Sequence, residues 1–262
     1  MDAIIETLAR ELSRDPVQVE NVVRLIDEGN TIPFIARYRK ELHGAMDDTT
    51  LRTLADRLQY LRNLAKRREE VRASIEGQGK LTEELASALA NAATLAEVED
   101  LYRPYKPKRR TRATMAKEKG LEPLADALSA FGGPVDPAAL AAAYVDPEKG
   151  VETVEDALQG ASDIVAERIS DDAGLRKVLR ALYLRRGTLV SRAAEKEPED
   201  TVYRLYYDFQ APVSRVQGHQ VLAIDRGERE GVLKVSVDLD PEAAKVAVRR
   251  ASVPGRAAMD FL

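Results

Sequence analysis

Apolar residues recur at every third or fourth position through the first third of the chain, which is the spacing of amphipathic helices. A first helix is expected over residues 4–12. A second is expected where Asp15 can act as the N-cap and Pro16 as the first helical residue. The run TIP at 31–33 marks the start of a third. Short helices joined by tight turns favour a helix-turn-helix-like part, with a plain helical bundle as the alternative.

The longest predicted helix begins at residue 48 or 49 and ends at the glycines at 77 and 79. Leucines keep the helical spacing along it, and arginines and lysines cover its outer face. Two shorter helices are expected after Thr82 and Thr94, because each threonine can accept a hydrogen bond from the first turn of a helix.

The second half of the chain continues mainly as helices. They are expected over residues 122–131, 137–144, 153–170, 171–186, 200–209, 219–226 and 241–250. Residues 219–226 could form either a helix or a strand, and Gly227, interpreted as a helix C-cap, favours the helix. Residues 233–239 alternate between apolar and polar side chains, which indicates a half-buried strand. Residues 188–192 are the expected partner strand, because one strand alone cannot satisfy its backbone.

These patterns predict a mainly α fold, a multi-helical array with a helix-turn-helix-like part and a small two-stranded β element near the C-terminal end. We expect three parts. Residues 1–80 form a helical part that includes the long helix, and residues 81–187 form a helical part with an exposed basic loop at 103–112. Residues 188–262 form a helical part that carries the β element.

The composition excludes several classes of protein. The chain has 262 residues, no cysteine and two histidines, so disulfides, thiolate metal sites and cysteine nucleophiles are excluded. No signal peptide and no run of apolar residues long enough for a membrane helix is recognised, so a cytoplasmic protein with no membrane contact is expected. The formal net charge is -4, so any affinity for nucleic acid must come from a local patch of positive charge.

The most unusual stretch is the basic loop. Residues 103–119 contain eight basic residues and one acid, Glu118. Guanidinium groups pair with phosphate oxygens, and a tyrosine among them can stack on a base. The alternative is a structural network in which these cations pair with acids on neighbouring helices. The expected phosphate contacts are Arg103, Lys106, Lys108, Arg109, Arg110 and Arg112, with Tyr105 as the stacking group.

A second basic run follows the TIP motif. Arg37, Arg39 and Lys40 are expected on one short helix, where they could face a phosphate backbone or a partner domain. The alternative is that Phe34 and Tyr38 pack inward and leave the cations solvated.

No catalytic site is recognised, and no cofactor or metal is expected. Residues 222–227, which include Asp225, are similar to the first acidic strand of an RNase H-like nuclease, but the further carboxylates that a Mg²⁺ site needs are missing. The run GQGK at 77–80 lacks the pattern of a phosphate-binding loop. A nuclease therefore remains only as an alternative that depends on Asp225.

Several motifs resemble the N-terminal region of the bacterial Tex family of transcription accessory proteins, which is related to a eukaryotic transcription elongation factor. They are TIPFIARYRKE at 31–41, IEGQGKLT at 75–82, DLYRPYKPKRRTRAT at 100–114, GLEPLAD at 120–126 and RGEREGVL at 226–233. The resemblance implies a helical, cytoplasmic region that binds nucleic acid and acts in transcription. It also implies a fragment, because the family's nuclease-like, helix-hairpin-helix and OB-fold domains would follow residue 262.

The sequence thus predicts a non-enzymatic, nucleic-acid-binding (RNA or DNA) helical region of a transcription accessory protein. RNA polymerase or ribosome-associated transcription machinery are the expected protein partners. The alternative is a protein–protein scaffold that docks to RNA polymerase or to the family's missing domains.

Overall fold

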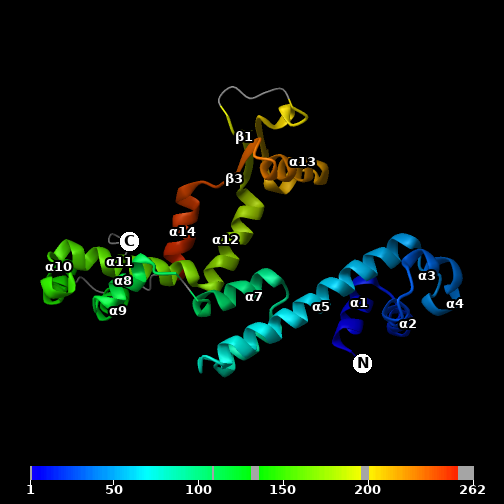
Figure 1. Ribbon diagram of the computed structural model, residues 1–262, viewed down its shortest axis with the longest axis horizontal. Helices are drawn as coiled ribbons and strands as arrows, with labels where there is room; N and C mark the ends of the chain where they lie inside the picture. The colour runs from blue at the N-terminus through cyan, green and yellow to red at the C-terminus, as the bar shows by residue number, and fades with distance from the viewer. Residues whose placement is uncertain (1, 108, 131–135, 196–200, 253–262) are drawn as a thin grey trace. The chain divides into compact units, whose positions relative to one another are not determined.

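The computed structural model describes residues 2–107, 109–130, 136–195 and 201–252 (Figure 1). The chain forms two compact units, Met1–Tyr102 and Arg103–Leu262. Helices make up most of both units, and a small antiparallel sheet belongs to the second. The predicted fold class is therefore confirmed in its mainly helical character, whereas the predicted division into three parts stays a prediction.

The N-terminal unit begins with four short helices and one long helix; the first three short helices pack against the long one, and the fourth packs on the second and third. The short helices are α1 (Ala3–Leu12), α2 (Pro16–Asp27), α3 (Ile32–Tyr38) and α4 (Lys40–His43), and the long helix is α5 (Asp48–Glu76). The predicted cap at Asp15 is present, with Oδ1 accepting from Val17 N at 2.8 Å, and Asp2 Oδ1 caps α1 by accepting from Ile4 N at 3.0 Å. The apolar stripes meet in one core that includes Leu8, Val22, Ile35, Leu51 and Leu54.

Two bidentate ion pairs join the long helix to the short ones. Arg57 of α5 donates to Glu11 at 2.7 and 2.8 Å, and Arg62 of α5 donates to Asp27 at 2.7 and 2.8 Å. The hydrogen bonds from these arginines lower the pKa of Glu11 and of Asp27. The cations on the outer face of the long helix thus partly serve to hold α1 and α2 in place.

The second half of α5 packs against α6 (Glu83–Asn91) and α7 (Leu95–Tyr102). Both helices begin after the predicted threonines, whose hydroxyl groups accept from Leu85 N and Glu97 N. The hydroxyl groups of Ser74 and Tyr102 lie 2.9 Å apart, and Arg67 donates to Glu99 at 2.6 Å. These polar contacts hold α7 against α5. Helix α7 ends at Tyr102, directly before the basic loop at 103–112.

The first part of the second unit is a set of short helices around α11 (Val154–Asp171). They are η1 (Arg103–Tyr105), α8 (Arg112–Glu118), α9 (Glu122–Ala130), α10 (Pro137–Ala141), η2 (Ala142–Tyr144) and η3 (Pro147–Lys149). Helix α11 starts with a capping box between Thr153 and Asp156. Helix α11 approaches α8 and the turn after it closely, because a Cβ at Gly160 would lie 3.3 Å from Ala116 Cβ and would overlap Leu121 Cδ1.

Helix α12 (Ala173–Arg186) leads into a three-stranded antiparallel sheet of order β2-β1-β3. The strands are β1 (Thr188–Ala193), β2 (Asp208–Pro212) and β3 (Leu233–Asp238). Two short turns, η4 (Arg204–Tyr206) and η5 (Val213–Arg215), flank β2. Helix α13 (Gly218–Arg229) packs beside β3, and α14 (Pro241–Ser252) returns alongside α12 (Figure 1).

Two predictions in this region are wrong. The β element was expected to have two strands, but residues 208–212 add a third, β2, beside β1. The helix expected over 200–209 is also wrong, because its last two residues belong to this strand. Phe209 and Ala211 alternate with exposed residues, and the Tyr206 ring packs against Phe209 at a centroid distance of 5.5 Å. The aromatic side chains thus stabilise a turn and a strand rather than the expected helix.

Gly227 has a different role from the predicted one. It lies inside α13, which continues to Arg229, so it is not a helix C-cap. A Cβ at Gly227 would lie 2.6 Å from Leu233 Cδ1 and 3.1 Å from Tyr203 Cδ1. The glycine therefore allows close packing of α13 on the sheet.

Some predicted features fall outside the described residues. They are the end of the predicted helix 122–131 at Phe131, the first residue of the helix expected over 200–209, and Lys108 of the basic loop.

Candidate nucleic-acid interface

The basic segment, residues 103–112, begins with a turn and ends in a helix. Arg103 lies in η1, and Arg112 is the first residue of α8, so the expected exposed loop is shorter than predicted. Tyr105 and Lys106 are half-buried and engaged in contacts within the protein, whereas Arg109 and Arg110 are exposed. The segment is therefore held against the unit at both of its ends.

Three acidic side chains of α11 face this segment. Asp163, Glu167 and Asp171 are spaced four residues apart, which places them on one face of the helix. Asp171 accepts from Arg103 Nε at 2.9 Å, and Glu167 accepts from the Thr111 hydroxyl at 3.0 Å. Asp163 Oδ1 lies 3.6 Å from Arg112 Nε. This acidic row supports the alternative interpretation of the segment, in which its cations pair with neighbouring helices.

The remaining cations of the segment differ in their pairing. Arg110 donates to Glu118 of α8 at 3.0 Å, but its side chain stays 70% exposed. The Arg112 side chain is 79% exposed in spite of its contact with Asp163. Arg109 makes no ion pair with any residue that the structure describes. Arg109, Arg110 and Arg112 are thus the described cations of this segment that a phosphate can reach most easily.

The second basic run lies at a break between two helices. Arg39 lies between α3 and α4, with φ −129° and ψ 29°, so Arg37, Arg39 and Lys40 do not share one short helix as predicted. Helix α3 stops at Tyr38, where Arg39 Nη1 instead donates to the Tyr38 carbonyl at 3.2 Å. The break spreads the three cations over the junction of α3 and α4, which we call the α3–α4 surface.

Two aromatic rings lie among these cations. The rings of Phe34 and Tyr38 are 5.2 Å apart, and the Arg39 guanidinium lies 5.3 Å from the centre of the Phe34 ring. The Arg37 guanidinium lies 6.0 Å from the centre of the Tyr38 ring, and Tyr38 is 56% exposed. Tyr38 therefore does not pack inward, in contrast to the alternative interpretation of this run.

The α3–α4 surface also keeps its positive charge. Within the described ranges, none of Arg37, Arg39 and Lys40 forms an ion pair with a carboxylate. Cation–π contacts orient a guanidinium group without neutralising it. Arg37 and Lys40 are exposed and Arg39 is half-buried, so two unpaired cations of this surface are directly accessible to an anion.

A rigid base supports this surface. Asn21 of α2 donates to the Leu42 carbonyl at 3.2 Å, and His43, the last residue of α4, is completely buried. Gly44 ends α4 with φ +61°, and a Cβ there would lie 2.2 Å from Gln18 Nε2. Helix α4 is thereby fixed to α2, so the cations are carried on a positioned element.

The nuclease-like interpretation of Asp225 loses its structural basis. Residues 222–227 form part of helix α13 rather than a strand, and Asp225 pairs with Arg229 at 2.6 Å. In the described part of the chain, no group of three or more acidic or histidine side chains is arranged to hold a metal ion.

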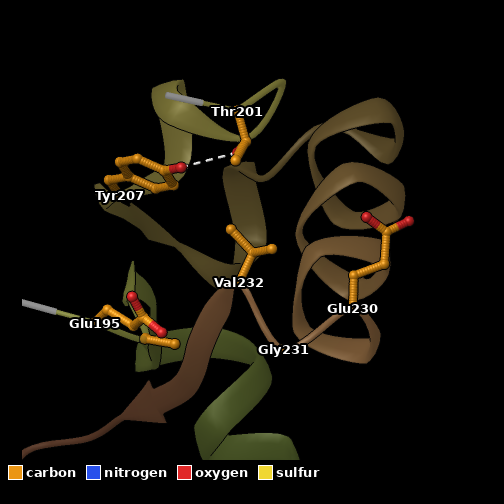
Figure 2. A pocket seen from close by; sticks show the side chains of 7 residues that line it. Glu195, Thr201, Tyr207, Glu230, Gly231 and Val232 are labelled. Carbon is orange, nitrogen blue, oxygen red and sulfur yellow. Dashed lines mark hydrogen bonds between the residues drawn. The ribbon is translucent and has the colours of Figure 1, made fainter. Parts of the chain in front are cut away.

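A pocket of about 380 Å³ lies between the end of β1 and the end of α13 (Figure 2). Its lining includes Glu195 and Glu230, and the hydroxyl groups of Thr201 and Tyr207 lie 2.8 Å apart. A hydrogen bond with Arg226 lowers the pKa of Glu230 and keeps it charged at neutral pH. A pocket with two carboxylates disfavours phosphate, so it is not part of the candidate interface.

One positively charged region escaped the sequence analysis. Helix α12 carries five arginine or lysine residues and no acid, and α14 adds Lys245, Arg249 and Arg250. Counting charges along each predicted helix would have found it.

The comparisons with known proteins identify the family. The Tex-like protein N-terminal domain matches residues 2–76, and the Tex central region-like domain matches residues 134–260. The chain belongs to the Tex family. Protein tex of Bordetella pertussis is 48% identical over 91% of this chain, and the transcriptional accessory protein Tex of Neisseria gonorrhoeae is 43% identical over 91%.

This Tex chain is much shorter than its relatives. It spans 30% of the Bordetella protein and 31% of the Neisseria protein. The human S1 RNA-binding domain-containing protein 1 is 32% identical over 90% of this chain, which spans 24% of that protein. Among the described residues, none of the helices has the length and apolar character needed to cross a membrane.

Proposed function

We propose that this Tex-family region binds nucleic acid, RNA or DNA, as part of a transcription accessory protein. The observation that carries the proposal is the α3–α4 surface. Arg37, Arg39 and Lys40 form no ion pair within the described ranges and lie beside the exposed Tyr38 ring. In this proposal α1–α4 act as a helix-turn-helix-like part.

The chemistry of the surface fits a phosphate backbone. Cations without carboxylate partners displace counterions from phosphates, and this release drives sequence-independent binding. An exposed tyrosine ring beside them offers a face on which a base can stack. Because the whole chain has a net charge of -4, binding must be local to such a surface.

The basic segment contributes in a secondary way. Arg109, Arg110 and Arg112 extend toward solvent and can add phosphate contacts, together with Lys108. Arg103 and Lys106 are held within the protein and position the segment, as the contact of Arg103 with Asp171 illustrates. Tyr105 is half-buried, so stacking on it needs a local rearrangement.

The relatives support the same class of function. One is named a transcriptional accessory protein and another an S1 RNA-binding domain-containing protein, although the matched part is about a third of the first and a quarter of the second. We propose a cytoplasmic setting, with RNA polymerase or ribosome-associated transcription machinery as protein partners. We propose no catalytic role and no cofactor for this region.

The test is fluorescence anisotropy with labelled single- and double-stranded RNA and DNA over a series of salt concentrations. Contact with about four to six phosphates would give a log–log salt slope of roughly -3 to -5. Replacing Lys108, Arg109 and Arg110 by Glu should flatten the slope by about one to three, and replacing Arg37, Arg39 and Lys40 by Glu should flatten it further. No binding at low salt would contradict the proposal.

A protein–protein scaffold is the second candidate. The observation in its favour is the row of α11 acids that pairs with the basic segment. In that case the region would dock to RNA polymerase or to further domains of the longer relatives. Polymerase capture by the purified chain, without nucleic-acid binding at low salt, would favour the scaffold.

A further inference from the structure

Helices α12 and α14 border an open groove in the second unit. Thr188 lies opposite Asp238 in the sheet, so α12 ends and α14 begins at the same end of strands β1 and β3. Figure 1 shows the two helices side by side. The groove between them has a volume of about 1000 Å³. Residues along one face of each helix line the groove.

The floor of the groove is apolar and accessible. Val178, Ala181 and Leu182 line it from α12, at the spacing of one helical face. Ala243, Val246 and Ala247 line it from α14. Val178 is 51% exposed and Val246 is 43% exposed, so two branched apolar side chains meet solvent at the same place. The small alanines between them leave room for the ridge of another helix.

The rim of the groove is positively charged. Arg185 and Arg186 of α12 and Arg250 of α14 line it, and none of them forms an ion pair within the described part of the chain. Two acids also lie at the rim, but both are already engaged. Glu242 accepts from Lys245 at 2.9 Å, and Asp240 accepts from Glu242 N at 3.1 Å. The groove therefore offers unpaired arginines to an incoming ligand.

We propose that this groove binds an acidic amphipathic helix of a partner protein. Such a helix would place aliphatic side chains on the floor, between Val178 and Val246, and carboxylates against the three arginines. The proposal does not rest on nucleic-acid binding, because it concerns a different surface and a different class of ligand.

The same features disfavour two other occupants. A second copy of the chain would bring one arginine-rimmed groove against another, and this like-charge contact is unfavourable. A nucleic acid would satisfy the arginines but leave the aliphatic floor uncovered, because phosphate and sugar groups are polar. Only a ligand that is both apolar and acidic matches the floor and the rim together.

The chain contains no cysteine, so one introduced thiol can carry a single dye. The test uses Val178→Cys labelled with an environment-sensitive dye, in the full chain. The probe is a synthetic helical peptide of about five turns, with leucines along one face and glutamates on both sides. Leu222→Cys on α13, at a residue that is 72% exposed, is the matched control for the position of the dye.

We expect a saturable dye response at residue 178 and none at residue 222. Changing Arg185 and Arg250 to Glu should lower the affinity for the peptide by about tenfold or more, which corresponds to about 1.4 kcal/mol. Both arginines are exposed, and circular dichroism of the double variant checks that it folds. A peptide with Ser in place of Leu should also bind at least about tenfold more weakly, because it lacks the apolar ridge.

Four results with the peptide would overturn the proposal. The first is the lack of a saturable response of the dye at residue 178, and the second is equal binding of the Leu and Ser peptides. The third is an equal dye response at residues 178 and 222. The fourth is displacement of the peptide by RNA, if RNA alone also changes the fluorescence of the dye at residue 178. Sedimentation of the unlabelled chain as a dimer that dissociates on Val178→Asp would also overturn it, in favour of a second copy as the occupant.

Discussion

The Nε atom of Arg103 donates a hydrogen bond to Oδ1 of Asp171 at 2.9 Å and joins the first residue of the basic segment to the last residue of α11. The Asp171 side chain is only 11% exposed, whereas that of Arg103 is 45% exposed. This contact shows that a cation in a basic run can serve the fold, so the number of cations alone does not measure the affinity of the run for phosphate.

Arg103 and Arg109 should therefore respond differently to the same substitution. Arg103→Gln should lower the free energy of unfolding by about 1 kcal/mol, because it removes the charge that pairs with a nearly buried carboxylate. Arg109→Gln should leave stability within about 0.5 kcal/mol of the wild type and weaken nucleic-acid binding instead. Urea unfolding and RNA anisotropy on both variants provide the check. A more stable Arg103→Gln protein would contradict this interpretation.

Gly227 provides a test of close packing. Alanine normally stabilises a helix interior relative to glycine by up to about 1 kcal/mol. Here Gly227→Ala should instead lower the free energy of unfolding by about 1–3 kcal/mol, because the new Cβ would collide with Leu233. Gly218→Ala on the same helix is the control, since a Cβ there has no atom within 4 Å. Thermal unfolding should show a smaller effect of Gly227→Ala in a Leu233→Val background.

His43 is expected to limit the stability of the N-terminal unit. It is completely buried, and neither ring nitrogen has a hydrogen-bond partner among the described residues. His43→Leu, which has a similar volume and no polar atoms, should raise the free energy of unfolding by about 1 kcal/mol. A loss of stability in the thermal unfolding of this variant would show that the imidazole is satisfied in solution.

The ion pairs of α5 predict a pH dependence. The hydrogen bonds from Arg57 and Arg62 hold the pKa values of Glu11 and Asp27 below their values in the unfolded chain. Their contribution to stability is therefore complete above the unfolded pKa values and is lost as pH falls through the folded ones.

Hydrogen exchange in α1 and α2 should accordingly speed up between about pH 5 and pH 3 more in the wild type than in an Arg57→Gln/Arg62→Gln variant. The comparison between the two proteins removes the effect of pH on the intrinsic exchange rate. An identical pH profile in both would show that these pairs do not contribute.

Local signals in the sequence were sufficient for most helices of the fold. Asp15 with Pro16 and the threonines at 82, 94 and 153 determine helix starts through contacts within one turn, so they can be recognised without tertiary information. Strand β2 could not be recognised in the same way. The five residues of β2 pair with β1 about twenty positions away in the sequence, and Phe209 follows tyrosines at 203, 206 and 207 whose spacing also fits a helix.

The pairing of the cations in the candidate site could not be predicted from the sequence. The cations of the basic segment are visible in the sequence, whereas their partners Asp163 and Asp171 lie on a helix 50 or more residues later. Which cations are neutralised is thus a tertiary property. The same holds for the break at Arg39, which distributes the second basic run over two helices.

The most direct test of the account is RNA binding by a charge-matched pair of variants. One carries Arg37, Arg39 and Lys40 changed to Glu, and the other carries Lys66, Arg72 and Lys80 of the same unit changed to Glu, so both change the net charge equally. If the α3–α4 surface binds phosphates, anisotropy at low salt should show a loss of affinity of about tenfold or more in the first variant only. Equal effects in the two variants would contradict the account, because they would mean that overall charge, and not this surface, determines binding.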